Sequence, residues 1–254
     1  MRAARLGDAR PFLHLLGGFE LWAGGRRVPL PIQPQRVLAL LAVSGTESRR
    51  ELVAGRLWGE TTRSRSLANL RTALWRIRQA DERLVLAARD SLTLGEQVRV
   101  DYQAAQVQAD ALLEDAAGGP EPTTAQARAL EGDLLPGWDE GWLDLDRERH
   151  RQRRMHALEA LSRRWTAAGR HARAVDAAYA AIAVEPLHES AHGALIEAHL
   201  GGGNRGDALL AFASYRRLLR AETGLAPSPA LVAALGGLAR PAPVSVREGY
   251  RRGA

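Results

Sequence analysis

Several residue types that define other protein classes are absent or scarce in this chain. Its 254 residues include no cysteine and only 5% aromatic residues, and all 35 basic residues are arginine. The absence of cysteine excludes disulfide frameworks and cysteine-ligated zinc. No run approaches the roughly 18 consecutive apolar residues that a membrane helix requires, and the N-terminus lacks the apolar segment of a signal peptide. We therefore expect a cytoplasmic globular protein of one or two domains.

Motifs typical of common enzyme classes are also missing. The sequence contains no HExxH, no P-loop and no GxSxG elbow. His188 and His192 have helical i, i+4 spacing near Glu185 and Glu189, which a metal can use, but surface positions on a helix explain this spacing better. Gly201-Gly202-Gly203 follows a helical segment, which favours a helix end over a phosphate cradle. We predict no catalytic residues, no metal and no cofactor.

Charge is divided unevenly along the chain. Residues 1–101 contain 17 arginines and 10 acidic residues, whereas residues 102–254 contain 18 arginines and 19 acidic residues. The net charge is therefore +7 for the first part and −1 for the second, which together give the +6 of the whole chain. Such an asymmetry favours contact of the first part with a polyanion. Arginine suits this role because its planar guanidinium forms paired hydrogen bonds with phosphate and with guanine edges.

The first part of the chain predicts a small sheet followed by two helices. Between Leu13 and Pro31, short apolar pieces are broken by two glycine pairs, which indicates a small antiparallel sheet. Residues 34–43 predict the first helix, with proline at its start. Ser48 and Glu51 have the spacing of a capping box, so a second helix is expected from there to about Gly59.

Residues 67–80 predict an amphipathic third helix after a polar turn at 59–66. At about 100° per residue its apolar side chains share one face. The opposite face carries Asn69, Thr72, Arg76 and Gln79, with Arg65 at its entrance and Arg71 and Arg78 on its flanks.

The polar face of this helix carries charge of one sign. Residues 63–78 include five arginines and no acid. A solvated helix face usually mixes both signs of charge, so we interpret this face as one that binds base edges and phosphates. Ala68 and Trp75 share the face, and an exposed tryptophan suits a protein contact as well. Arg71 is placed where it can instead pair with an acid of the second part.

Three short β-prone pieces follow, at 84–86, 92–94 and 98–100, and predict a terminal hairpin with Arg89 near its tip. Sheet, three helices and hairpin are the order of a winged helix-turn-helix. In that fold the third helix enters the major groove and the hairpin, or wing, contacts the backbone or the minor groove. Trp58 is expected in the core.

The row from Glu47 to Gln79 resembles the OmpR-type winged helix of the Streptomyces antibiotic regulatory protein family. A Leu-Trp pair ends the second helix, here Leu57-Trp58, and an Asn-Leu-Arg-x-Ala-Leu-x-Arg-x-Arg run forms the third, here Asn69 to Arg78. The sheet entry at 15–30 and the wing at 89–102 are similar as well. The resemblance implies a DNA-binding activator, two molecules of which bind promoter direct repeats and recruit RNA polymerase.

The second part predicts almost continuous helix from Thr123, after a helix at 104–117 and a Gly-Pro breaker at 118–122. At an offset of 34 residues, alanines, leucines and a turn glycine align with one another. An offset near 34 is the tetratricopeptide period. The aligned pairs are Ala157/Ala191, Ala160/Ala194, Leu161/Leu195, Gly169/Gly203, Ala174/Ala208 and Ala177/Ala211.

This part is similar to the bacterial transcriptional activator domain that follows the winged helix in the same family. The matching pieces are 130–135, Trp142-Leu143 with Glu148-Arg149, and the specific run 224–231. The expected fold is mostly α with small β elements, a winged helix-turn-helix followed by an all-α tetratricopeptide-like repeat domain. We expect the boundaries 12–101 for the DNA-binding domain, 102–238 for the activator domain, and 239–254 for a disordered tail.

The expected function is sequence-specific activation of transcription by a cytoplasmic, nucleoid-associated homodimer, controlling an antibiotic or other secondary-metabolite gene cluster. The helical part is expected to supply the dimerisation and regulatory surface. The site residues follow. Expected base contacts are Arg65, Asn69, Thr72 and Arg76; phosphate contacts are Arg63, Arg71, Arg78 and Arg89; and the loop that the resemblance assigns to polymerase is Gly59, Glu60, Thr61 and Thr62.

A second hypothesis comes from another functional class. In it the chain is a helical-repeat interaction or scaffold protein, whose degenerate winged helix contacts polymerase or a partner regulator and binds DNA weakly or not at all. Salt-dependent binding to duplex DNA separates the two hypotheses, because neutralised phosphates release counterions.

Overall fold

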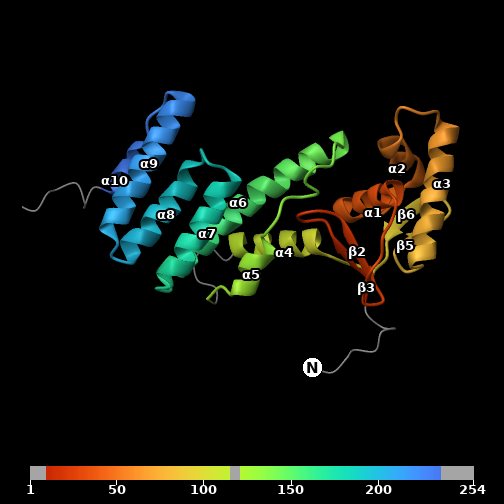
Figure 1. Ribbon diagram of the computed structural model, residues 1–254, viewed down its shortest axis with the longest axis horizontal. Helices are drawn as coiled ribbons and strands as arrows, with labels where there is room; N and C mark the ends of the chain where they lie inside the picture. Colours follow the sequence, from red (N-terminus) through yellow and green to blue (C-terminus); the bar gives the residue numbers. More distant parts are fainter. Residues whose placement is uncertain (1–9, 115–120, 236–254) are drawn as a thin grey trace, which may run out of the picture. The chain divides into compact units, whose positions relative to one another are not determined.

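The computed structural model of the chain describes residues 10–114 and 121–235 (Figure 1). The described residues are mostly helical with a few short strands, which confirms the expected fold class. Described residues up to Ala157 pack into one compact unit, and those from Leu158 onward pack into another. Among the described helices, none is long and apolar enough to cross a membrane. The expected tail 239–254 and part of the breaker 118–122 lie outside the described residues.

The first sheet has the strand order β3-β2-β1-β7. Gly24 and Gly25 both have positive φ, 57° and 75°, as a tight hairpin turn between β2 and β3 requires. The last strand was expected in the wing, and that prediction is wrong because it pairs in parallel with the first strand, Leu13 opposite Val100. The strands are β1 (Phe12–His14), β2 (Glu20–Ala23), β3 (Arg26–Arg27) and β7 (Arg99–Val100).

Three helices follow in the expected order, α1 (Ile32–Ser44), α2 (Arg50–Leu57) and α3 (Arg63–Ala80). α3 begins inside the segment that was predicted as a turn. Thr62 makes this possible, because its side chain accepts a hydrogen bond from the backbone N–H of Arg65 at 3.4 Å and so caps the helix. α1 likewise begins two residues before the predicted start.

A second sheet, β4-β6-β5, includes the wing, which we define as residues 85–94. It contains β4 (Ser48–Arg49), β5 (Val85–Ala87) and β6 (Ser91–Leu94). The capping box predicted at Ser48 is wrong, because the backbone of Ser48 pairs with Leu92 and α2 has no side-chain cap. Gly95 closes the base of the wing, where a Cβ would lie 1.8 Å from the carbonyl oxygen of Arg83, so only glycine is accommodated.

The core of the winged helix includes residues that are distant in sequence. Leu134, Leu135 and Leu143 are at most 2% exposed and pack in the same core as the three helices. The backbone N–H of Leu135 donates to the carbonyl of Leu15 at 2.8 Å, and that of Gly17 donates to Asp133 at 2.8 Å. The prediction of nearly continuous helix from Thr123 is therefore wrong for residues 130–140, which complete this core instead.

An ion pair holds the same segment against α1. The Nε of Arg36 lies 2.5 Å from Oε1 of Glu140, its Nη2 donates to Oε2 at 2.8 Å, and both side chains are largely buried. The guanidinium also lies 6.0 Å from the ring centroid of Trp58, which packs against the core as expected. The unit is completed by α4 (Asp101–Glu114), α5 (Thr124–Ala129), the 3₁₀ turn η1 (Gly141–Leu143) and the start of α6 (Asp144–Ala167).

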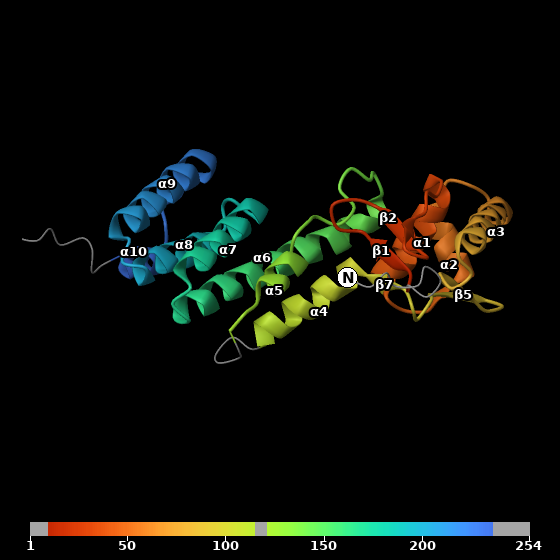
Figure 2. The same ribbon diagram turned by 60° about the horizontal axis from the view of Figure 1, so that its bottom comes forward.

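The second unit consists of packed helix pairs that confirm the 34-residue repeat. Ala174 on α7 and its counterpart Ala208 on α9 are fully buried, and Leu161 on α6 and Leu195 on α8 are at most 3% exposed. The matched glycines Gly169 and Gly203 have φ of 72° and 78° in the turns between the helices of each pair. These helices are α7 (His171–Val184), α8 (Glu189–Gly201), α9 (Arg205–Thr223) and α10 (Pro229–Ala234), visible in Figure 2.

Candidate nucleic-acid interface

The sequence of α3 determines which of its faces is buried. Ser66, Leu70, Ala73 and Ile77, at helical spacing, are buried in the core of the first unit. Apolar burial of this stripe fixes the rotation of the helix about its axis. The remaining side chains of α3 therefore point sideways or outward, and the outward face is accessible.

The expected base-contacting residues occupy this outward face unequally. Arg65, Thr72 and Arg76 are exposed. Asn69 is only half-buried and lies to one side, where it lines a hollow of about 410 Å³ together with Arg76, Trp58 and residues at the start of α1. An amide at the edge of the face reaches a base only if the start of α1 also comes close to the DNA.

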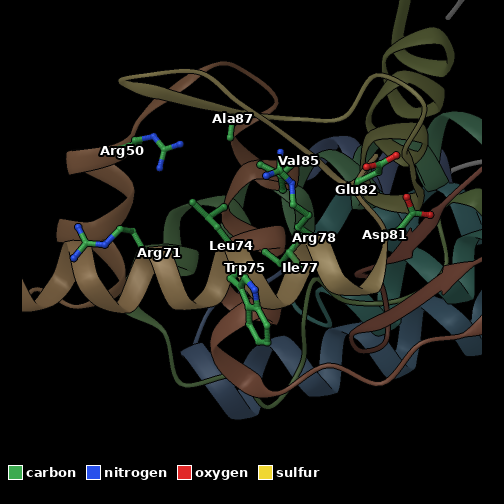
Figure 3. Close-up of a pocket in the computed structure, with 10 residues that line it drawn as sticks. All are labelled: Arg50, Arg71, Leu74, Trp75, Ile77, Arg78, Asp81, Glu82, Val85 and Ala87. Carbon is green, nitrogen blue, oxygen red and sulfur yellow. The ribbon is translucent and has the colours of Figure 1, made fainter.

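Two of the four expected phosphate-contacting residues lie on the other side of α3. Arg71 and Arg78 line a groove of about 350 Å³ between α3 and the wing, together with Arg50 from the start of α2 (Figure 3). Sequence reasoning did not select Arg50, because the capping-box prediction placed it within a helix start and its distance from the wing is not encoded locally. Three guanidinium groups from two helices thus surround one groove.

The acids near this groove are unequal in their effect. Asp81 accepts hydrogen bonds from Arg83, Nε to Oδ1 at 3.0 Å and Nη2 to Oδ2 at 2.7 Å. These bonds lower the pKa of the Asp81 carboxyl and compensate its charge locally. Glu82 also lines the groove, is exposed, and opposes a phosphate at that end.

Arg63 differs from the other arginines of α3. Its guanidinium forms an ion pair with Glu51 on α2, and both side chains are exposed. A phosphate contact by Arg63 would therefore compete with this pair. Within the described ranges, the four remaining arginines of the helix form no ion pair with a carboxylate; they are Arg65, Arg71, Arg76 and Arg78.

The wing presents Arg89 at its turn. The N–H of Ala88 donates to the carbonyl of Ser91 at 3.0 Å, which closes a short hairpin with Arg89 exposed at the tip. Arg50 braces this turn in two ways. Its guanidinium donates to the carbonyl of Ala88 at 3.1 Å, and its backbone N–H donates to the backbone carbonyl of Asp90 at 3.0 Å. The tip is thus held by the start of α2.

The loop between α2 and α3, residues 59–62, is mostly exposed, but half of it has a structural role. Gly59 and Glu60 are accessible. Thr61 donates from its N–H and its hydroxyl to the carbonyl of Trp58, at 3.1 and 3.0 Å, and Thr62 caps α3. Gly59 and Glu60 are therefore the members of the loop that are available to another protein.

The histidine pair considered as a metal site is not arranged as one. His192 is buried, which contradicts the surface position expected for it. Its Nε2 lies 2.9 Å from the carbonyl oxygen of Pro186 and its ring stacks on Tyr215 with centroids 4.2 Å apart. His188 precedes α8 at its N-cap position. The imidazole of His192 belongs to the packing of the helical pairs.

The first unit has the architecture of a winged helix-turn-helix, and paired helices follow it. The family model described as "Bacterial transcriptional activator domain" matches residues 100–236, more than half of the chain. The chain therefore belongs to the bacterial transcriptional activator domain family.

Individual relatives agree with this assignment. The chain is 31% identical over 230 residues to the regulatory protein AfsR of Streptomyces griseus and 30% identical over 230 residues to that of Streptomyces coelicolor. The alignments cover 85% of this chain and 23% of each relative, so the chain spans about a quarter of their length. The structure of Mycobacterium tuberculosis EmbR in complex with a low-affinity phosphopeptide shares the fold, with a TM-score of 0.72, 21% identity, and coverage of 89% of this chain and 64% of EmbR.

Proposed function

We propose that this chain is a sequence-specific DNA-binding activator in which α3 enters the major groove and the wing contacts the sugar-phosphate backbone. The observation that carries the proposal is the charge on and beside α3. Arg65 and Arg76 lie on the outward face, and Arg71 and Arg78 flank the wing groove, all of them exposed. Guanidinium groups that already have carboxylate partners would gain little from phosphate, whereas these four are available for it.

The proposal assigns distinct roles to the groups around α3. Arg65, Thr72, Arg76 and the half-buried Asn69 contact base edges, where arginine recognises guanine and asparagine recognises adenine. Arg71, Arg78 and Arg89 contact phosphates and set the position of the helix on the duplex. Arg63 joins them only after it leaves Glu51. The chemistry is binding, without catalysis.

The remaining parts of the proposal concern assembly. Two molecules bind side by side on promoter direct repeats, and Gly59 and Glu60 contact RNA polymerase. The helical pairs of the second unit serve dimerisation and regulation. The boundary between the DNA-binding domain and the activator domain lies near residue 101. The regulated genes form an antibiotic or other secondary-metabolite cluster, and the protein acts at the nucleoid. The resemblance to antibiotic regulators supports these parts.

A fluorescence anisotropy titration tests the proposal. Labelled promoter fragments from the genomic neighbourhood are titrated with the full chain at 50 and 200 mM salt, with unrelated duplex as competitor. We expect specific binding that weakens by about 10³-fold or more between these concentrations if six or more phosphates are neutralised. A complex with two protein molecules is expected at saturation.

Trp75 supports a second candidate function, an interaction protein that binds DNA weakly. Its side chain is 61% exposed on the outward face of α3, a property shared by protein-binding surfaces. In that case competitor DNA removes the chain from every promoter fragment, whereas RNA polymerase still retains it in a pull-down. Retention by polymerase without specific DNA binding would favour this function over the first.

A further inference from the structure

Trp75 is not required by the core of the winged helix. Leu67 and Leu74 of the same helix pack against the core, whereas Trp75 is 61% exposed. Trp75 is one of the residues that line the wing groove, and in Figure 3 its ring points away from Leu74 and Val85. A large apolar side chain on the accessible face of α3 is therefore available for contact with another molecule.

Trp75 belongs to a stripe along the centre of the outward face, which also carries the exposed Gln79. At about 100° per residue, Ala68, Thr72 and Trp75 fall within about 60° of one another. The hydroxyl of Thr72 donates to the carbonyl oxygen of Ala68 at 3.2 Å, so the hydroxyl is directed back along the helix. The methyl group of Thr72 is then the part of this exposed side chain left to face outward.

Arginines lie on both sides of this stripe. Arg65 and Arg76 fall on one side and Arg71 and Arg78 on the other, and all four are exposed. Whatever meets the stripe is therefore an apolar group set between hydrogen-bond acceptors and anionic groups. In the DNA major groove the thymine C5-methyl is such a group, since purine acceptors and phosphates lie beside it.

We propose that the stripe Ala68–Thr72–Trp75 recognises thymine methyl groups, so that Trp75 determines sequence specificity through an apolar contact. The inference rests on the proposed function and deepens it. The arginines hold the duplex and recognise purines, and the stripe selects thymine over cytosine at the base pairs facing it. Thr72 contributes its methyl group to this contact.

Deoxyuridine substitution tests the inference, because uracil keeps every hydrogen-bonding group of thymine and lacks only the methyl. A duplex is first selected from a random-sequence pool by the wild-type full chain. Each thymine of that duplex is then replaced singly by deoxyuridine, and Kd is measured by anisotropy. Removing one buried methyl is expected to weaken wild-type binding about fourfold, from about 0.8 kcal/mol per buried carbon.

Variants assign the effect to Trp75. At the sensitive positions, Trp75→Ala is expected to bind the thymine and uracil duplexes equally, and Thr72→Ser is expected to show a smaller difference than the wild type. Trp22→Ala is the matched control, an exposed tryptophan on β2 outside α3, and retains the full difference. Thermal unfolding of Trp75→Ala should match that of the wild type.

Failure of the inference is distinguishable from failure of the proposed function. If the wild type selects no sequence over competitor DNA, both the proposed function and the inference are contradicted. If it selects a sequence and no uracil substitution changes Kd, or if the thymine preference persists in Trp75→Ala, the inference is overturned and the proposed function stands. A selected site without thymine at the α3 contacts would also overturn it.

Discussion

Single residues of α3 with the same chemistry have different surroundings, and their expected roles follow from these surroundings. Arg63 is paired with Glu51, Arg78 lines the wing groove, and Arg76 lies on the face next to the hollow beside α1. Asn69 shares that hollow. The sequence predicted an arginine-rich face, but it did not show which of these arginines has a carboxylate partner, because Glu51 lies on another helix.

Arg76→Ala and Arg89→Ala are expected to weaken DNA binding in different ways. Loss of Arg76 removes a base contact. The binding free energy for the cognate duplex should therefore become less favourable by about 1–3 kcal/mol, and base preference should relax at one position. Loss of Arg89 removes a phosphate contact, so binding to all sequences should weaken alike and the salt slope should decrease by about 1. Anisotropy against cognate and unrelated duplexes at several salt concentrations measures both effects.

Arg217→Ala is a control for these two variants, because it removes the same charge from an exposed position on α9. Its affinity and salt slope should equal those of the wild type. Unchanged affinity and preference in both Arg76→Ala and Arg89→Ala would remove α3 and the wing from the interface.

At the level of elements, spacing in the sequence predicted most helices, whereas their beginnings depended on local contacts. α3 begins at a cap, Thr62, that composition alone did not reveal. α2 lacks the predicted cap because Ser48 is a strand residue. Period and apolar pattern specify a helix over many residues, but an end is decided by one or two hydrogen bonds.

The helix pairs of the second unit should not tolerate larger residues at their matched alanines. Ala174 and Ala208 are fully buried at equivalent positions of the repeat. Ala174→Trp and Ala208→Trp are each expected to destabilise the chain by roughly 1–3 kcal/mol through overpacking. Ala172→Trp, on an exposed position of α7, should change stability little. Urea unfolding of the three variants makes the comparison, and wild-type stability in both buried variants would contradict the packed repeat.

At the level of the whole molecule, the winged helix depends on residues that follow it in the chain. Leu134, Leu135 and Leu143 lie in its core, and Arg36 of α1 pairs with Glu140. The similarity of residues 130–135 to the activator domain family was recognised in the sequence, but nothing local showed that these residues complete a different core.

A fragment that ends at residue 114 is therefore expected to be markedly less stable than the intact chain. It lacks three buried leucines, each worth about 1.5–3 kcal/mol of burial, and the partner of Arg36. Circular dichroism during heating should show a lower and broader transition for this fragment than for one that ends at residue 157. Equal transitions in the two fragments would show that the winged helix folds without the 130–143 segment.

Buried histidines give stability a dependence on pH. Burial lowers the pKa of His150, which lies between Gln106 of α4 and the carbonyl of Gly132, and also that of His192. Burial holds these imidazoles neutral in the folded state. Below the ordinary histidine pKa of 6.5, the unfolded state therefore binds more protons than the folded state. The free energy of unfolding should therefore fall as pH decreases through and below that value.

Urea unfolding at pH 7.5, 6.5 and 5.5 tests this dependence. His150→Gln should show a shallower fall than the wild type, with the remaining slope due in part to His192. A wild-type slope in His150→Gln would mean that its burial does not govern the pH response.

The sequence by itself determined the features that arise from neighbouring residues. Helical periodicity, the Gly24-Gly25 turn, the 34-residue repeat and the arginine-rich face of α3 each depend on spacing of a few residues, and the structure has all of them. These features suffice to predict a winged helix followed by helical pairs. The positions of glycines and the spacing of apolar residues determine local turns and helices, so they can be recognised from the sequence.

Only the tertiary structure decided what depends on residues far apart. It pairs β7 with β1, places Leu134 and Leu135 in the winged-helix core, and joins Arg50 to the wing. These contacts join segments that are far apart in the sequence, and many sequences with the same local pattern could pair such segments differently. The physical reason is that long-range pairing is selected by the shape of the whole core and not by the residues adjacent to each partner.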